Sequence, residues 1–161
     1  MSRRDQIRMT SAEVDEFLRR PGLTLDVASF GPDGNIHLVA MWYGLLSDGT
    51  VAFHTYQKSQ KVRNWQRDTR FTALVEAGET YDTLQGVELV GTVELADDLD
   101  TKLAIAASME GRYPAPPARA GRSSPTGSGA GVGDYLAKRI GVLLRTDRVV
   151  SWDHTKLGGT Y

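Results

Sequence analysis

The strongest constraint on the fold comes from three strand-like runs that follow one another with only tight turns between them. Residues 23–30 and 36–43 are rich in strand formers and flank the turn Gly-Pro-Asp-Gly-Asn at 31–35. A third run, 50–54, follows the turn Ser-Asp-Gly at 47–49. Parallel strands need a crossover connection of a dozen or more residues, so these three strands must pair in antiparallel order.

Short helices and further strands follow. Thr10 to Glu13 has the form of a capping box, which predicts a helix that ends before Pro21. Helical patterns then predict helices over 59–68, 97–112 and 134–140, and strand patterns predict strands over 71–75, 86–95 and 141–152. We therefore expect a mainly β protein with short helices, in which six antiparallel strands close into a barrel and hide their edges. An open α+β sheet is the alternative.

Composition limits the classes of protein that remain. At 161 residues the chain has the size of a single domain, which we expect to span residues 1–161. Residues 113–133 are rich in Pro, Gly, Ser and Ala, a composition that predicts a flexible loop or lid. The formal net charge of −1 gives no overall attraction to nucleic acid or to an anionic membrane.

Location and redox chemistry follow from what the sequence lacks. The absence of cysteine excludes disulfides, thiolate zinc sites and thiol nucleophiles, and it fits a reducing cytoplasm. The N-terminus has no apolar signal core, and no apolar run is long enough to span a bilayer. We expect a cytoplasmic protein.

The segment Lys-Ser-Gln-Lys-Val-Arg-Asn at 58–64 is the candidate site. It stands between a strand and a helix, and the start of a helix offers unpaired N–H groups and partial positive charge to a phosphate. Helical spacing places Asn64 on the face of Lys61, and Ser59 is placed to cap the helix. We therefore predict an anion site made of Lys58, Ser59, Lys61 and Asn64. A solvated helix face is the alternative interpretation.

Five short sequence motifs, in this order along the chain, resemble those of a known family. They are 31–39, Met-Trp-Tyr-Gly at 41–44, Lys-Val-Arg-Asn at 61–64 with Arg-Asp-Thr-Arg at 67–70, Val-Gly-Thr-Val-Glu-Leu at 90–95, and Ser-Trp-Asp-His at 151–154. In their order and spacing the chain resembles the pyridoxamine-phosphate-oxidase-like split barrels, particularly the branch that depends on the deazaflavin coenzyme F420. The resemblance covers residues 10–154, except for the loop at 113–133.

The resemblance implies a homodimer whose flavin-like ring lies at the subunit interface and whose phosphate meets the strand-to-helix turn. Lys61 and Asn64, with Val62 in the same phrase, match the phosphate-binding segment of the family, and Lys58 and Ser59 match it less closely. The positions that line the ring in the family correspond to Met41, Trp42, Tyr43, Thr55 and Tyr56.

The implied activity is reduction of an unsaturated or quinone-like small molecule by hydride transfer from reduced F420. Because the cofactor carries the chemistry, no catalytic dyad is needed, and a proton can come from solvent or from Tyr56. An FMN-dependent oxidoreductase and a non-enzymatic binder of a cofactor or haem are the alternatives. Basic residues beyond the turn, such as Arg63, Arg119 and Arg122, suit the acidic tail of F420 and favour that cofactor.

The sequence argues against two other kinds of site, a metal site and the active site of a serine hydrolase. His37, His54 and His154 lack the short spacing of metal ligands, so no metal site is expected. No Gly-x-Ser-x-Gly word occurs, which argues against a serine hydrolase of that type.

Overall fold

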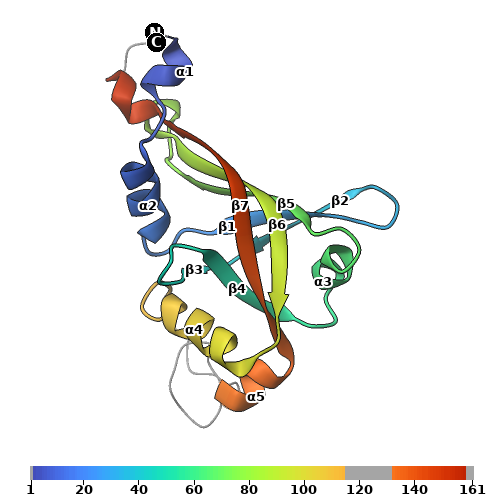
Figure 1. Ribbon diagram of the computed structural model, residues 1–161. Coiled ribbons are helices and arrows are strands. Elements are labelled where there is room, and N and C mark those ends of the chain that lie inside the picture. The colour runs from blue at the N-terminus through green and yellow to red at the C-terminus, as the bar shows by residue number, and fades with distance from the viewer. Residues whose placement is uncertain (1, 115–131, 159–161) are drawn as a thin grey trace.

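Seven antiparallel strands form one curled sheet in the computed structural model, which describes residues 2–114 and 132–158 (Figure 1). Their order across the sheet is β2-β1-β5-β6-β7-β4-β3. The strands are β1 (Leu25–Phe30), β2 (Ile36–Met41), β3 (Gly44–Leu45), β4 (Val51–Tyr56), β5 (Arg70–Ala77), β6 (Gln85–Ala96) and β7 (Arg139–Asp153). The helices are α1 (Arg3–Gln6), α2 (Ser11–Arg19), α3 (Gln60–Trp65), α4 (Leu99–Met109), α5 (Val132–Ala137), and the 3-10 turns η1 (Tyr81–Thr83) and η2 (His154–Leu157).

The long pair of β6 and β7 gives the sheet its bend. The pairing between these strands shifts register at one bulge, between Val90 and Gly91. A bulge bends its strand and increases the local twist. A side chain at Gly91 would meet the carbonyl oxygen of Arg145, so this position needs glycine for close approach of the two backbones.

The inner face of the curl holds the main hydrophobic core. Strand β1 buries every second residue, Leu25, Val27 and Ser29, because side chains alternate between the two faces of a strand. Helix α2 adds Phe17 and Leu18 to the same cluster. Each fully buried side chain of this size contributes roughly 1.5–3 kcal/mol relative to an exposed one.

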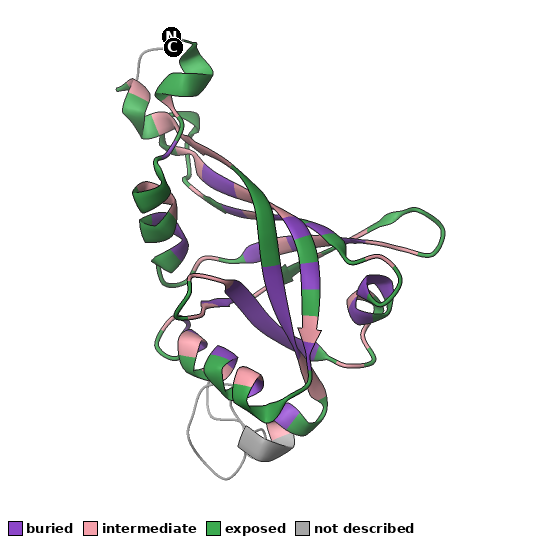
Figure 2. Cartoon of the chain, in the orientation of Figure 1, coloured by how far each residue is buried: buried purple, intermediate pink, exposed green. Residues whose placement is uncertain are grey.

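A smaller cluster covers the outer face of β4 and β7. Helix α4 directs Ile105 and Met109 against Ala52 and Leu143, which point away from the inner core. Figure 2 shows β4 buried along most of its length, whereas α1 is exposed. Strand β4 is therefore packed on both faces, which makes it a rigid support for the turn at its end.

Two residues that follow α4, Arg112 and Tyr113, join the helices to the sheet. The Tyr113 hydroxyl accepts a hydrogen bond from the Tyr43 amide at 3.0 Å and donates to the Leu23 carbonyl at 2.8 Å. The Arg112 guanidinium donates to the last carbonyls of α2, those of Leu18, Arg19 and Arg20. Carbonyl groups at a helix end lack partners within the helix, so Arg112 satisfies them.

Most of the expected elements are confirmed, but the strand number is wrong. The capping box of Thr10 and Glu13 and the hairpin of β1 and β2 are present. The sheet has seven strands rather than six, because the two-residue β3 is too short to give an alternating pattern. Strands β2 and β3 are the two edges of the sheet, so hydrogen bonds do not close it into a complete barrel.

The structure bears only partly on two further expectations, the lack of a membrane-spanning segment and the loop at 113–133. Within residues 2–114 and 132–158, no helix is long and apolar enough to cross a membrane. The loop predicted at 113–133 lies mostly outside the described residues. The structure describes only Tyr113 and Pro114 at its start and the backbone of α5 from Val132 at its end.

We predict that Tyr113→Phe lowers the free energy of unfolding by about 1–3 kcal/mol, because the buried Tyr43 amide loses its hydrogen-bond acceptor. Urea unfolding of the purified protein measures the change. Tyr56→Phe is the matched control, since it removes a hydroxyl from an exposed ring and should change stability by less than about 0.5 kcal/mol. Equal stability of the Tyr113 variant and the parent would contradict this role of the hydroxyl.

Candidate functional site

The connection from β4 to α3 is a tight turn with a fixed backbone. Strand β4 ends at Tyr56, and the Ser59 amide donates back to the Tyr56 carbonyl at 3.0 Å. The Gln57 amide donates to the Lys138 carbonyl at 3.2 Å, which ties the turn to the chain just before β7. The turn is thus held from two sides before α3 begins at Gln60.

Lys61 is a partly buried cation in the first turn of α3. Burial lowers the pKa of its ammonium group. None of the residues in 2–114 and 132–158 forms a hydrogen bond or ion pair with the Lys61 side chain that could offset this cost. Lys58, exposed on the turn itself, likewise has no such partner in the described parts of the chain. The Asp97 carboxylate near the turn accepts from Gln57 and pairs with Lys102, so neither lysine of the turn is paired with an acidic group of the described residues.

Ser59 is the N-cap residue of α3, but its hydroxyl does not cap the helix. The hydroxyl lies 3.4 Å from the Thr55 hydroxyl instead. Thr55 is buried on the inner face of β4, so the two hydroxyls mark the inner side of the turn. The Ser59 side chain therefore leaves the first amides of α3 available to another acceptor.

Asn64 is buried and its amide is occupied by the protein. The amide nitrogen donates to the Ser29 hydroxyl at 3.0 Å, and the amide oxygen accepts from Gln60 at 2.8 Å and from Arg67 at 2.7 Å. The side chain has no exposed surface with which to touch a ligand. In this conformation the Asn64 amide holds α3 on β1. Val62 is also buried, so its side chain packs and only its backbone is near the turn.

Tyr56 lies on the opposite face of β4 from Thr55, because neighbouring side chains of a strand point in opposite directions. The Arg139 guanidinium lies between two rings, 4.1 Å from the ring centre of Tyr56 and 3.8 Å from that of Tyr135. Thr55 and Tyr56 were both expected to line one ring. The structure places only Thr55 on the inner side with Ser59.

Lys138 and Arg139 are basic residues beside the turn that the sequence analysis missed. The pairing of Tyr56 with Arg139 brings them there. Two adjacent basic residues directly before a strand are a visible signal in the sequence. The sequence did not show that the first residues of β7 pair with the last residues of β4.

Met41, Trp42 and Tyr43, which were expected to line the cofactor ring, lie apart from the turn between β4 and α3. Met41 pairs with Leu25 at one end of β1, whereas Asn64 of α3 bonds Ser29 toward the other end. Four residues of strand separate the two places by roughly 13 Å. Within one chain the structure therefore does not gather all of the predicted residues into one pocket.

Trp42 and Tyr43 point in different directions, as strand-like alternation suggested. The Tyr43 ring is fully buried and its hydroxyl donates to the Leu18 carbonyl at 2.8 Å, so it serves the core. The Trp42 ring is 40% exposed and stacks on Tyr113 with ring centres 4.5 Å apart. Trp42 is the member of this pair that a ligand or a partner chain can contact.

His54 belongs to a buried polar cluster under α4. Its Nε2 donates to the Lys102 carbonyl at 2.9 Å, and its ring meets Tyr135 edge-on. Burial lowers the pKa of His54 to about 4. Among the described residues, no group of three or more His, Cys, Asp or Glu is placed to hold a metal ion. The position of His54 under the helix is explained by packing and by this one hydrogen bond.

The match to a protein family comes from most of the chain. Residues 10–129 match the sequence pattern of the pyridoxamine 5'-phosphate oxidase family, so the chain belongs to that family. The family resemblance noted from the sequence is thereby confirmed. The finer assignment to the F420-dependent branch stays a prediction. No curated protein sequence matches the chain.

Solved structures share the fold. A conserved hypothetical protein from Mycobacterium tuberculosis is 35% identical, covers 100% of this chain and 95% of its own, and has a TM-score of 0.83. An F420 reductase is 23% identical, with 84% of this chain and 94% of that chain covered and a TM-score of 0.61. A haem-binding protein from Mycobacterium smegmatis is 16% identical, with 92% and 60% covered and a TM-score of 0.57. The last two show a common fold and nothing finer.

We predict that the folded protein loses stability as the pH falls from about 6.5 toward 4. The unfolded chain takes up a proton on His54 near its ordinary pKa of 6.5, whereas the folded protein resists protonation down to about 4. The unfolded state then binds more protons, so the contribution of His54 is fully present above 6.5 and is lost below it.

Urea unfolding at pH 7 and at pH 5 measures this loss. His54→Gln is the matched variant, because an amide can also donate to the Lys102 carbonyl but does not titrate. We expect a smaller drop in unfolding free energy between the two pH values for the variant. An equal drop in both proteins would show that His54 is not the group responsible.

Proposed function

We propose that this protein is an F420-dependent reductase, which transfers a hydride from reduced deazaflavin to an unsaturated or quinone-like small molecule. The observation that carries the proposal is Lys61, a partly buried ammonium group without a partner among the described residues. Burying a charge costs free energy unless an opposite charge or hydrogen bonds offset the cost. Membership in a family of flavin-type enzymes supports a cofactor phosphate as the missing anion.

The residues of the turn fit such a group. Lys61 and Lys58 would bind the phosphate, and the Ser59 hydroxyl and the first amides of α3 would orient it. Asn64 keeps α3 in place without touching the ligand. A bound deazaflavin supplies the hydride chemistry, so the chain need only bind, orient and exclude water.

The basic residues around the turn favour F420 over FMN. Arg63 on α3 is exposed, Lys138 lies beside the turn just before β7, and Arg139 begins β7 opposite Tyr56. These groups suit the longer and more acidic tail of F420, whereas FMN has only its phosphate to offer them. Arg119 and Arg122, also considered for this tail, lie outside the described residues. An FMN-dependent oxidoreductase of the same fold is the second candidate.

A titration with F420, FMN and haem, followed by fluorescence or visible absorption, tests the site. We predict that Lys61→Ala weakens F420 binding about 10- to 100-fold, since a charge-assisted hydrogen bond contributes about 1.5–3 kcal/mol. Gln66→Ala, a substitution of the exposed C-cap residue of α3, is the matched control and should bind as the parent does. Equal affinity of the Lys61 variant and the parent would refute the assignment.

The same experiment separates the alternatives. Tighter binding of FMN than of F420 would favour the FMN-dependent oxidoreductase, and binding of haem alone would favour a non-enzymatic binder. Turnover separates enzyme from binder: reduced F420 is supplied with unsaturated lactones, quinones and tetrapyrroles. If no compound in the panel oxidises it, the reductase proposal fails.

We also propose that the protein acts as a homodimer. The edge strand β2 exposes Ile36 and Leu38, which are 66% and 63% accessible, on the hairpin that projects from the sheet (Figure 1). Exposed apolar side chains on an unpaired edge strand favour association with another chain. Light scattering should give the mass of two chains, and Ile36→Lys with Leu38→Lys should shift it to one. A monomeric parent would contradict the proposal.

A further inference from the structure

A groove of about 450 Å³ lies between the N-terminal segment and the latter half of β7. Its walls come from α1, from the link between α1 and α2, from the start of α2, and from residues 148–151 of β7. Figure 1 shows α1 at the top of the molecule and α3 well apart from it at the right side, so the groove is distinct from the β4–α3 turn. The volume lies in the range of small-molecule sites.

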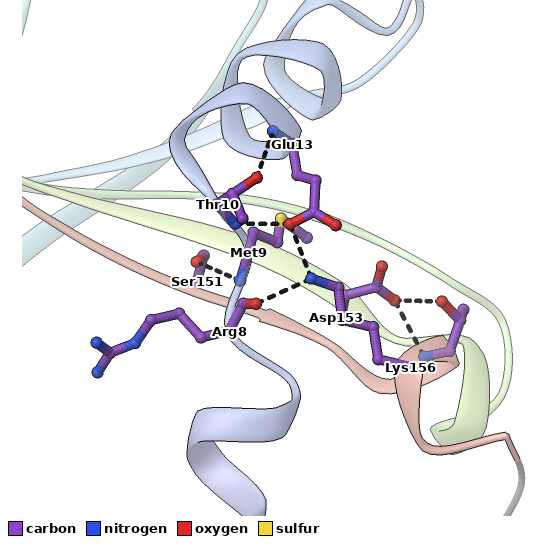
Figure 3. Close-up of polar contacts among 8 residues, drawn as sticks. Arg8, Met9, Thr10, Glu13, Ser151, Asp153 and Lys156 are labelled. Carbon is purple, nitrogen blue, oxygen red and sulfur yellow. Dashed lines mark hydrogen bonds and ion pairs between the residues drawn. The ribbon is translucent and has the colours of Figure 1, made fainter.

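Residues 8–13, which form one wall of the groove, are anchored to the end of β7 and to η2, as Figure 3 shows. The Met9 amide donates to the Ser151 hydroxyl at 3.2 Å. The Lys156 ammonium donates to the Arg8 carbonyl at 2.9 Å and pairs with Glu13 at 2.8 Å. The Lys156 hydrogen bond, followed by those from Thr10, lowers the pKa of Glu13 to about 2. These contacts preform the groove.

Three arginines from three elements line this groove: Arg4 of α1, Arg8 of the following link and Arg148 of β7. Their guanidinium groups form no ion pair or hydrogen bond with the rest of the described chain. Arg19, by contrast, is paired with Asp15 at 2.7 Å. Three like charges around one groove repel one another, so an anion placed among them is stabilised.

The Asp5 carboxylate, on which the charges of Arg8 and Arg4 act, is already engaged. Asp5 accepts hydrogen bonds from the Ser2 amide at 3.1 Å and the Ser2 hydroxyl at 2.7 Å. The pKa of Asp5 is lowered chiefly by those hydrogen bonds, and Arg8 and Arg4 lower it further. Asp5 thus caps α1 and leaves the guanidinium donors free to bind another anion.

Besides the arginines, the groove is lined by four apolar residues, Met9, Val14, Val149 and Val150, and by two serines, Ser11 and Ser151. Val149 is 48% exposed although it lies within a strand. An exposed apolar side chain beside unpaired cations suits a ligand that has both an apolar body and an anionic head.

We infer that this groove binds a small amphipathic anion, a phosphate or carboxylate attached to an aromatic or aliphatic body. The three arginines hold the anionic head, because guanidinium groups bind planar and tetrahedral oxyanions through paired hydrogen bonds. The apolar side chains cover the body. The site stands beyond the proposed cofactor turn and does not depend on it.

Fluorescence titration of the purified full chain with 1-naphthyl phosphate tests the inference. The uncharged 1-naphthol and inorganic phosphate are run beside it, and 1-naphthoate distinguishes a carboxylate head from a phosphate head. We predict that Arg8→Gln and Arg148→Gln each weaken binding of the preferred anion about tenfold or more. Arg3→Gln is the matched control, because Arg3 belongs to the same helix as Arg4 but does not line the groove.

Each result of these titrations either supports or overturns the proposed anion site. Binding of either naphthyl anion that is lost in the two groove variants and kept in Arg3→Gln supports the site, and Lys61→Ala should leave it unchanged. No binding of either anion, equal affinity of parent and groove variants, or 1-naphthol binding as tightly as the anions would overturn it.

Discussion

The position of the proposed cofactor turn depends on one buried side chain, Asn64. Its amide joins α3 to the inner face of the sheet through Ser29 and accepts two hydrogen bonds from Gln60 and Arg67. A buried amide that lacks partners costs free energy, so these three hydrogen bonds favour one placement of the helix. Strand β4, packed on both faces, fixes the other end of the turn.

Lys61 lies one helical turn before Asn64, so the hydrogen bonds that fix the position of α3 also fix the backbone of Lys61. Its partial burial lowers the pKa of the ammonium group, yet nothing in the described part of the chain balances the charge. Such an arrangement weakens the folded state and is typical of binding sites, where the ligand provides the missing partner. This charge imbalance is the physical basis for placing an anionic cofactor group at the turn.

Local patterns in the sequence were sufficient for most elements and for the family. The capping box at Thr10, the β1–β2 hairpin and the strand-to-helix turn are all signals within a few residues of one another. The site was harder to predict, because it depends on contacts between distant segments. The burial of Asn64 against Ser29 and the pairing of Tyr56 with Arg139 join residues that no short-range pattern links. Residues expected around one ring therefore separate in the fold.

The most direct test of the proposed site is a crystal structure of the protein with F420 bound. We predict that oxygen atoms of the cofactor phosphate lie within about 3 Å of the Lys61 ammonium nitrogen. Asn64 should keep its hydrogen bond to Ser29 in that complex. A phosphate bound at another place, with the Lys61 ammonium left in contact with water or protein only, would contradict the assignment of this turn as the anion site.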